Sequence, residues 1–229
     1  MNQWDKAAEV FDKIVGQGND PPRLFLYQPA LEKLLGDLQD KVILDAGCGN
    51  GYFEKNSGNL AREIIAIDYS KKLIEIAKSR VCGGNVSFKM ADLEKPLDFE
   101  KEYFDLIISN MVLHFLKDIQ TCAGEFYRVL KSGGKLVFSV PHPDYYSAKH
   151  DGKKVEAEIK VKEMALKGTS LLAYFYRPLD YYEDCFEKAG FKLAKVLEPP
   201  ISEELVEVYP HFAKFVGIPR AAFFSFSKP

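Results

Sequence analysis

The sequence lacks several features that would mark other classes of protein. Its few cysteines are scattered and form no Cys-x-x-Cys pair, so neither a disulfide framework nor a cysteine metal site is expected. These cysteines are Cys48, Cys82, Cys122 and Cys185. Lysine and arginine number 31 against 33 aspartates and glutamates, a net charge of −2, which gives no general attraction toward nucleic acid.

Long apolar stretches are also missing. No apolar run approaches the roughly 18 residues of a membrane helix, and residues 1–6 carry no apolar signal region. We therefore expect a cytoplasmic protein with reduced thiols, and neither a membrane nor a nucleic acid as its partner.

What the sequence does contain is an alternation of short apolar runs with helical patterns. Apolar residues make up 47% of the chain, enough for a substantial core. This alternation predicts an α/β fold with a doubly wound, mostly parallel sheet of seven strands and right-handed crossovers. The last strand follows a long connection and is expected to be antiparallel. Strands are predicted at 42–44, 63–68, 86–90, 103–110, 135–140, 191–197 and 221–226, and helices at 4–15, 52–61, 70–80, 119–130 and 178–189.

Two segments interrupt this pattern and suggest a domain organisation. Residues 1–40 precede the first strand and are expected to form an N-terminal helical lid. Residues 142–177 are expected to form an inserted substrate cap, with a charged helical stretch near 153–167. The core would then comprise 41–141 and 178–229.

A glycine-rich turn after the first strand is the feature around which the chain is organised. Asp45 opens a turn with glycines at 47, 49 and 51. Gly47 and Gly49 allow positive φ angles and a close approach of a ligand to the backbone. Cys48 between them is expected to be a small residue that fills the turn, although its thiol would lie near a ligand. A dinucleotide fold requires Gly-x-Gly-x-x-Gly, and the spacing here departs from it.

This turn resembles the first motif of the class I S-adenosylmethionine-dependent methyltransferases, Asp/Glu-x-Gly-x-Gly-x-Gly. Asp68, at the end of the second strand, matches the acid that binds both ribose hydroxyls in this family. Asp92 matches the position that meets the adenine amino group. Residues 109–114 match the segment under the methionine part of the cofactor, and residues 127–136 match the junction that leads into the fifth strand.

The resemblance implies a Rossmann-like methyltransferase fold that binds S-adenosylmethionine and releases S-adenosylhomocysteine. An aromatic face can stabilise the sulfonium as it does other cations. The cofactor-binding residues are then expected to be Tyr27, Asp45, Gly47, Cys48, Gly49, Asp68, Tyr69, Asp92, Leu93 and Asn110.

The expected acceptor is a small molecule. The Asn/Asp-Pro-Pro-Tyr/Phe motif of adenine and amide methyltransferases is replaced by residues 109–112, Ser-Asn-Met-Val. His142, between two prolines, is a candidate either to orient or deprotonate the acceptor or merely to bind a loop carbonyl. Arg177 would either pair with an acceptor carboxylate or lie solvated on the surface. The predicted acceptor pocket is His114, Tyr146, Tyr176 and Arg177, and no metal site is expected.

Two other functions stay open at this point. One is an NAD-dependent oxidoreductase, and the other is a non-catalytic accessory protein that binds the cofactor. The acceptor, the choice between oxygen and nitrogen, and the choice between a monomer and a homodimer are not fixed by these residues, because fold-level resemblance does not determine them.

Overall fold

The computed structural model describes residues 2–15, 20, 22–81, 84–163 and 172–229. Within these ranges seven strands form one sheet in the order β3-β2-β1-β4-β5-β9-β8, and β6 and β7 form a separate hairpin. The strands of the large sheet are β1 (Val42–Ala46), β2 (Glu63–Asp68), β3 (Val86–Met90), β4 (Phe104–Asn110), β5 (Leu130–Pro141), β8 (Lys192–Leu197) and β9 (Ala221–Ser227). The predicted seven-stranded α/β sheet is confirmed.

Strands β1 to β5 are parallel, and β9 runs antiparallel to both β5 and β8. The predicted direction of the last strand is therefore confirmed. Its register pairs Pro141 with Ala221 and Val137 with Ser225. This register brings the residue that precedes β9 to the same edge of the sheet as the carboxyl end of β5.

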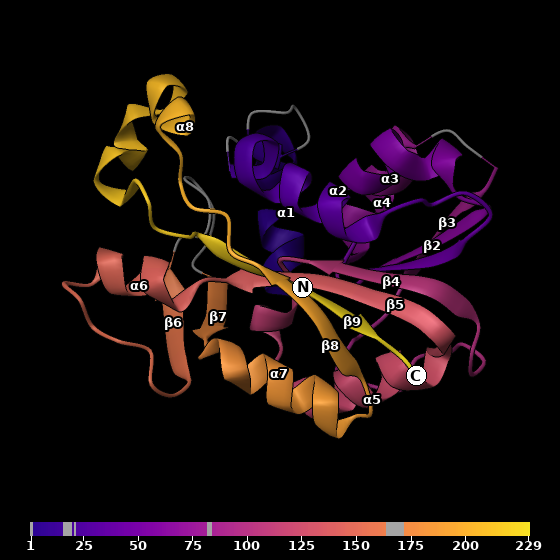
Figure 1. Ribbon diagram of the computed structural model, residues 1–229. Coiled ribbons are helices and arrows are strands. Elements are labelled where there is room, and N and C mark those ends of the chain that lie inside the picture. Colours follow the sequence, from indigo (N-terminus) through magenta and orange to yellow (C-terminus); the bar gives the residue numbers. More distant parts are fainter. Residues whose placement is uncertain (1, 16–19, 21, 82–83, 164–171) are drawn as a thin grey trace.

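Helices cover both faces of the sheet (Figure 1). Alternate residues of a strand point to opposite faces, so the apolar residues of β1 are divided between two cores. Leu44 belongs to the core under α5 and α7, and Ile43 to the core under α2 and α4. The helices are α1 (Gln3–Val15), α2 (Gln28–Leu35), α3 (Tyr52–Ser57), α4 (Lys71–Arg80), α5 (Ile119–Val129), α6 (Pro143–Lys149), α7 (Leu179–Lys188) and α8 (Glu203–Val208), with short turns η1 (Arg23–Tyr27), η2 (Gly58–Leu60), η3 (Leu113–Phe115) and η4 (Pro210–Phe215).

Side-chain caps fix where several helices begin. The Ser70 hydroxyl accepts a hydrogen bond from the Leu73 amide and begins α4, as predicted for this N-cap. Asp118 caps α5 through the Thr121 amide. Each such cap satisfies an amide that would otherwise lack a partner, which stabilises a helix by about 1 kcal/mol.

The predicted charged helix in the inserted segment is wrong for the residues that the structure describes. Residues 159–163 form β6 (Ile159–Glu163), which pairs with β7 (Leu172–Tyr176). The sequence there alternates apolar and charged residues with a period of two, and Ile159 and Val161 pack against the aromatic cluster around Tyr174. This period is that of a strand. Residues 164–167 of the predicted helix lie outside the described ranges.

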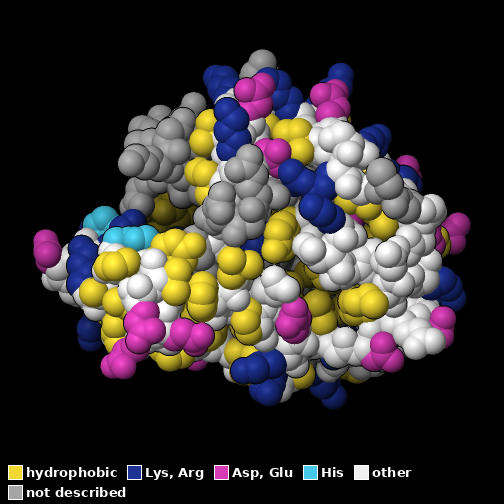
Figure 2. All heavy atoms as spheres, turned by 90° about the horizontal axis from the view of Figure 1, so that it is seen from above, with side chains coloured by type: hydrophobic (Ala, Val, Ile, Leu, Met, Phe, Trp, Pro, Cys, Tyr) yellow, Lys and Arg dark blue, Asp and Glu magenta, His cyan; other side chains and the backbone are white. Residues whose placement is uncertain are grey.

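Three other boundaries differ from the prediction. The helix after the glycine turn ends as α3 at Ser57, not at residue 61, and continues only as the short turn η2. Strand β5 already begins at Leu130 rather than Lys135. The long connection 199–219 contains α8 and η4. Figure 2 shows hydrophobic side chains gathered on the side of the molecule where α8 and η4 lie, and Val208 and Val216 are exposed there.

Candidate active site

The glycine turn lies at the carboxyl end of β1. The amides of Gly47 and Cys48 donate to the Ile67 carbonyl at 2.8 and 3.0 Å, which ties the turn to β2. Gly47 has a φ of 96°, and a Cβ atom there would lie 2.3 Å from Cγ2 of Val112. Gly49 has a φ of 58°. Position 47 therefore requires glycine, as the motif predicts, whereas the φ of Gly49 is one that Met111 also adopts, at 58°.

Asp68 lies beside this turn. Its Oδ2 accepts a hydrogen bond from the Gly49 amide at 2.9 Å, and its Oδ1 accepts one from the Ser70 amide at 2.8 Å. A carboxylate has about four acceptor positions, so each oxygen can still accept one hydroxyl. Burial raises the pKa of Asp68 to about 6, although the backbone hydrogen bonds oppose this rise. Tyr69, the next residue, is exposed.

Two buried carboxyl groups lie close to the turn. Of these, Asp45 is predicted from the sequence but Glu54 is not. Asp45 is 4% exposed and Glu54 of α3 is 1% exposed. Burial and the nearby Asp45 raise the pKa of Glu54 well above its usual range, and burial also raises that of Asp45. Burial likewise raises the pKa of Cys48, so its thiol stays protonated, which fits its expected role as a small residue in the turn.

Three more of the predicted cofactor residues lie along the same edge of the sheet. Asp92 follows β3, and its carboxylate accepts from the Glu94 amide at 3.0 Å and pairs with Lys95 at 3.1 Å. The neighbouring Leu93 is buried. Asn110 ends β4 and accepts a hydrogen bond from the Ser139 hydroxyl.

A cavity of about 670 Å³ lies between α2 and α3 and reaches Asn110. Arg23, another residue that the sequence did not single out, lines it together with Tyr52. The Arg23 guanidinium lies 4.5 Å from the centre of the Tyr52 ring, and its Nε is 3.8 Å from the Asp20 carboxylate. Arg23 follows a proline in a breaker-rich loop, and no periodicity in the sequence marks it.

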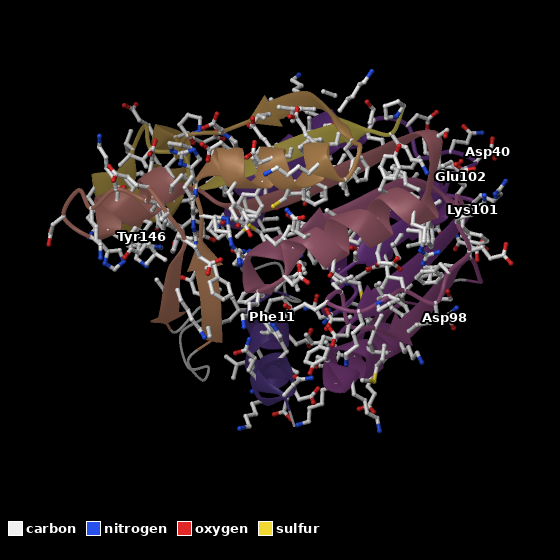
Figure 3. The ribbon with its side chains drawn as sticks, turned by 90° about the horizontal axis from the view of Figure 1, so that it is seen from below. Phe11, Asp40, Asp98, Lys101, Glu102 and Tyr146 are labelled. Atoms are coloured by element: carbon white, nitrogen blue, oxygen red, sulfur yellow. The ribbon has the colours of Figure 1, made fainter. Side chains whose placement is uncertain are left out.

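Helix α1 packs across the glycine turn. The Ser70 hydroxyl donates to the Asp5 carboxylate at 2.7 Å. Phe11, labelled in Figure 3, is the nearest group to a Cβ atom placed on Gly49, at 3.4 Å. Trp4 contacts Phe115 with ring centres 4.8 Å apart. The helix thus bridges the end of β2 and the turn after β4, and its role as a lid stays a prediction.

His142 is almost fully buried and has protein partners at both ring nitrogens. Its Nδ1 accepts from the Asp144 amide at 3.0 Å, which caps α6, and its Nε2 lies 2.7 Å from the Glu198 carboxylate. This arrangement differs from the expected choice between an acceptor contact and a loop carbonyl. A role as base would require the ring to leave Glu198, and that role stays a prediction.

Three of the four predicted acceptor residues lie in one aromatic cluster. His114 packs 5.5 Å from Tyr174, which packs 5.6 Å from Tyr176, and Tyr176 packs 4.6 Å from Tyr146. Burial, with a smaller effect of Arg177, lowers the pKa of His114 to about 3. Its ring is therefore neutral at physiological pH.

Arg177 lies next to this cluster but is held by protein groups. It is fully buried, so the expected solvated surface position is wrong. Its Nε donates to the Glu158 carboxylate at 2.7 Å, and one terminal nitrogen donates to the Leu116 carbonyl at 2.8 Å. Arg177 thus fastens the inserted segment to η3.

Tyr27 lies apart from the other predicted cofactor residues. It is buried in η1, with its ring 5.9 Å from that of Phe223 in β9. The Arg220 guanidinium is 6.0 Å from the Tyr27 ring. These contacts attach Tyr27 to the start of β9, and its cofactor role stays a prediction.

Comparison with known proteins agrees with this geometry. The family described as "Methyltransferase domain" matches residues 44–138. An uncharacterized protein of Haemophilus influenzae is 29% identical over 77% of this chain and 77% of its own length. A malonyl-[acyl-carrier protein] O-methyltransferase of Bacillus cytotoxicus is 32% identical over 61% of this chain. The chain spans only 48% of the length of that relative.

A crystal structure of an S-adenosylmethionine-dependent methyltransferase from Mesorhizobium loti has the same fold. Its TM-score is 0.71 at 22% identity, with 87% of this chain and 96% of that chain covered. Residues 44–138 thus match the methyltransferase-domain family, and the fold of the chain is that of the class I S-adenosylmethionine-dependent methyltransferases. S-adenosylmethionine is the methyl donor of this family. The family match argues against an NAD-dependent oxidoreductase.

In the part of the chain that the structure describes, no helix is long and apolar enough to cross a membrane. Among the same residues, no three histidine, cysteine, aspartate or glutamate side chains are grouped as a metal site would require.

Proposed function

We propose that this protein transfers the methyl group of S-adenosylmethionine to an oxygen or nitrogen of a small-molecule acceptor. The observation that carries the proposal is the junction of the glycine turn with Asp68, whose carboxylate bonds the Gly49 amide and keeps acceptor positions for two hydroxyls. Asp68 would hold the ribose, Asp92 the adenine, and the turn at Gly47 the methionine part. The bound cofactor supplies an electrophilic methyl group on a positively charged sulfur.

The protein's own contribution would be mainly alignment. In-line displacement is accelerated when nucleophile and methyl group are held collinear and close. Helix α1 and the aromatic cluster around Tyr174 would exclude water from the two sides of the site. The domain division follows from these roles, with 1–40 as the lid, 142–177 as the cap and the remainder as the core.

Thermal unfolding with S-adenosylhomocysteine, and with NADH in a parallel sample, tests the cofactor site. A ligand at about 100 times its dissociation constant adds roughly 2.7 kcal/mol, or about 5–10 °C for a chain of this size. We expect this shift with S-adenosylhomocysteine alone. Asp68→Asn should weaken the affinity at least tenfold, because the amide accepts fewer hydroxyl hydrogen bonds.

Asp98→Asn is the matched control for this variant. Asp98 is exposed, and Figure 3 shows it at the right of the view, well away from Phe11. The Asp98→Asn variant should therefore bind S-adenosylhomocysteine as tightly as the wild type. A shift with NADH only, or equal losses in the two variants, would refute the assigned site.

Turnover separates the enzyme from the accessory-protein alternative. Acceptors should be screened for formation of S-adenosylhomocysteine, with malonyl-acyl-carrier protein included because several relatives are named for it. Tight cofactor binding without turnover of any acceptor would favour the accessory role. Gel filtration decides between the monomer and the homodimer.

A further inference from the structure

Arg220 occupies a position that the proposed cofactor contacts do not explain. It directly precedes β9, whose first residue pairs with Pro141 at the carboxyl end of β5. Its carbonyl accepts a hydrogen bond from the His142 amide at 3.0 Å. The side chain is therefore attached at the edge of the sheet where ligands of open α/β folds bind.

Aromatic rings from three separate elements surround the Arg220 guanidinium. Its central carbon lies 6.0 Å from the ring centre of Tyr27 in η1, 5.4 Å from Tyr145 in α6 and 5.3 Å from Phe212 in η4. Such contacts attract a cation, but ring faces do not accept its N–H donors in the way that oxygen atoms do. We call this set of four residues the Arg220 box.

The side-chain oxygens of the Arg220 box are the hydroxyls of Tyr27 and Tyr145, and neither is hydrogen-bonded to Arg220 among the described residues. A guanidinium has five N–H donors and stays charged, yet no hydrogen bond or ion pair joins that of Arg220 to another residue in the described part of the chain. The charge of Asp20 helps to raise the pKa of Arg220, but the ion pair that Asp20 forms is with Arg23, at 3.8 Å. By contrast, the buried Arg177 is bonded to Glu158 and to a backbone carbonyl.

A partly buried cation without an oxygen partner is costly unless a ligand supplies one. The planar fork of arginine fits the two oxygens of a carboxylate or phosphate. Burial raises the pKa of Tyr27, so its phenol stays protonated and can donate to the same anion. The apolar ring surfaces would contact the carbon atoms next to that group.

We infer that Arg220 binds an anionic oxygen group, a carboxylate or a phosphate, on the acceptor of the methyl transfer. This inference rests on the proposed function and specifies the acceptor class. The acceptor would place its charged end in the Arg220 box and its nucleophilic atom toward the cofactor edge of β4 and β5. Arg220 is thereby a specificity-determining residue.

The test titrates inorganic phosphate and malonate, separately and at constant ionic strength, into the full chain saturated with S-adenosylhomocysteine. Saturation with this product keeps the anions from the cofactor site. We expect saturable binding of at least one anion, as measured by calorimetry or by NMR. Arg220→Gln should weaken that binding at least tenfold. Phosphate alone would identify a phosphate ester as the acceptor, and malonate alone a carboxylate.

Lys214→Gln is the matched control, because Lys214 is an exposed cation on η4, over the ring of Phe215. It should change the affinity less than twofold. Arg220→Lys keeps the charge but loses the planar fork and should bind at least threefold more weakly, which provides a second reading if the glutamine variant does not fold.

The inference is overturned if the wild type binds neither anion, or if both Arg220 variants bind as tightly as the wild type. These outcomes are distinct from a failure of the proposed function. That failure would appear as the absence of S-adenosylhomocysteine binding by the wild type, before any anion is added.

Discussion

At the scale of single residues, Gly47 shows how little freedom the cofactor turn has. Its positive φ costs an L-residue roughly 1–2 kcal/mol, and a Cβ atom would overlap Cγ2 of Val112, which adds about 1–3 kcal/mol of overpacking. We therefore expect Gly47→Ala to lower the free energy of unfolding by about 2–5 kcal/mol, as measured by urea denaturation at 25 °C.

Gly217→Ala separates the two costs. Gly217 also has a positive φ, of 81°, but a Cβ atom there meets nothing within 4 Å, so only the backbone strain of about 1–2 kcal/mol applies. In addition, Val112→Ala should restore part of the stability of the Gly47→Ala variant. Equal losses at the two glycines, or no recovery in the double variant, would show that the contact with Val112 is unimportant.

At the scale of elements, helix α1 closes the cofactor edge through a few aromatic contacts. If α1 is a lid, loss of its contact with the turn at Gly49 should speed the release of S-adenosylhomocysteine. Phe11→Ala removes the side chain next to the glycine turn, and we expect the dissociation rate to rise about tenfold, or ~1.4 kcal/mol. Stopped-flow displacement measures this rate, and hydrogen exchange of the α1 amides should be slowed by the bound product.

Lys13→Ala on the exposed side of the same helix is the control, and it should leave the dissociation rate unchanged. A packing role without a lid role predicts another result. Phe11→Ala would then lower the stability of the protein while the dissociation rate stays that of the wild type.

Elements with a strong local pattern could be predicted from the sequence, and those held by distant contacts could not. The central strands of the large sheet, such as β1 with all of its residues buried, are short apolar runs, so their pattern is independent of the rest of the fold. Strand β6 could not be predicted because its sequence is short and rich in charged residues, which also suits a helix. Its pairing with β7 and its packing on the aromatic cluster determine that it is a strand. Helix α8 and η4 are short and follow prolines, and their residues pack on cores formed elsewhere in the chain.

The residues of the candidate site show the same contrast between local patterns and distant contacts. Asp68 and the glycines lie at fixed distances from strand ends, so a motif finds them. Arg23 begins the short turn η1 and Arg220 lies in the connection before β9. Some of their neighbours, such as Tyr52 for Arg23 and Tyr27 for Arg220, are far away in sequence. Glu54 lies in a short helix where nothing in the sequence distinguishes a buried acid from an exposed one. Side chains defined only by tertiary contacts leave no periodic signal.

At the scale of the whole molecule, His114 couples global stability to pH. Its pKa is lowered from 6.5 to about 3 in the folded protein, so the unfolded chain binds a proton that the folded protein excludes between these values. The stability that His114 contributes is therefore present above pH 6.5 and is lost as the pH falls toward 3. The raised pKa values of Asp45 and Asp68 act in the opposite direction, since these acids favour the folded state as the pH falls toward 4.

The contribution of His114 is therefore measured as the difference in free energy of unfolding between the wild type and the His114→Leu variant. Between pH 7.5 and pH 4.5 the wild type should lose about 2.7 kcal/mol more free energy of unfolding than His114→Leu, because pH 4.5 is two units below the unfolded pKa of 6.5 and each unit is worth about 1.36 kcal/mol. Urea denaturation at both pH values measures it. His211→Leu, with an exposed ring, should follow the wild type at both. If the His114 variant did so as well, the ring would be protonated without loss of the fold, and the aromatic cluster would have to be open to water.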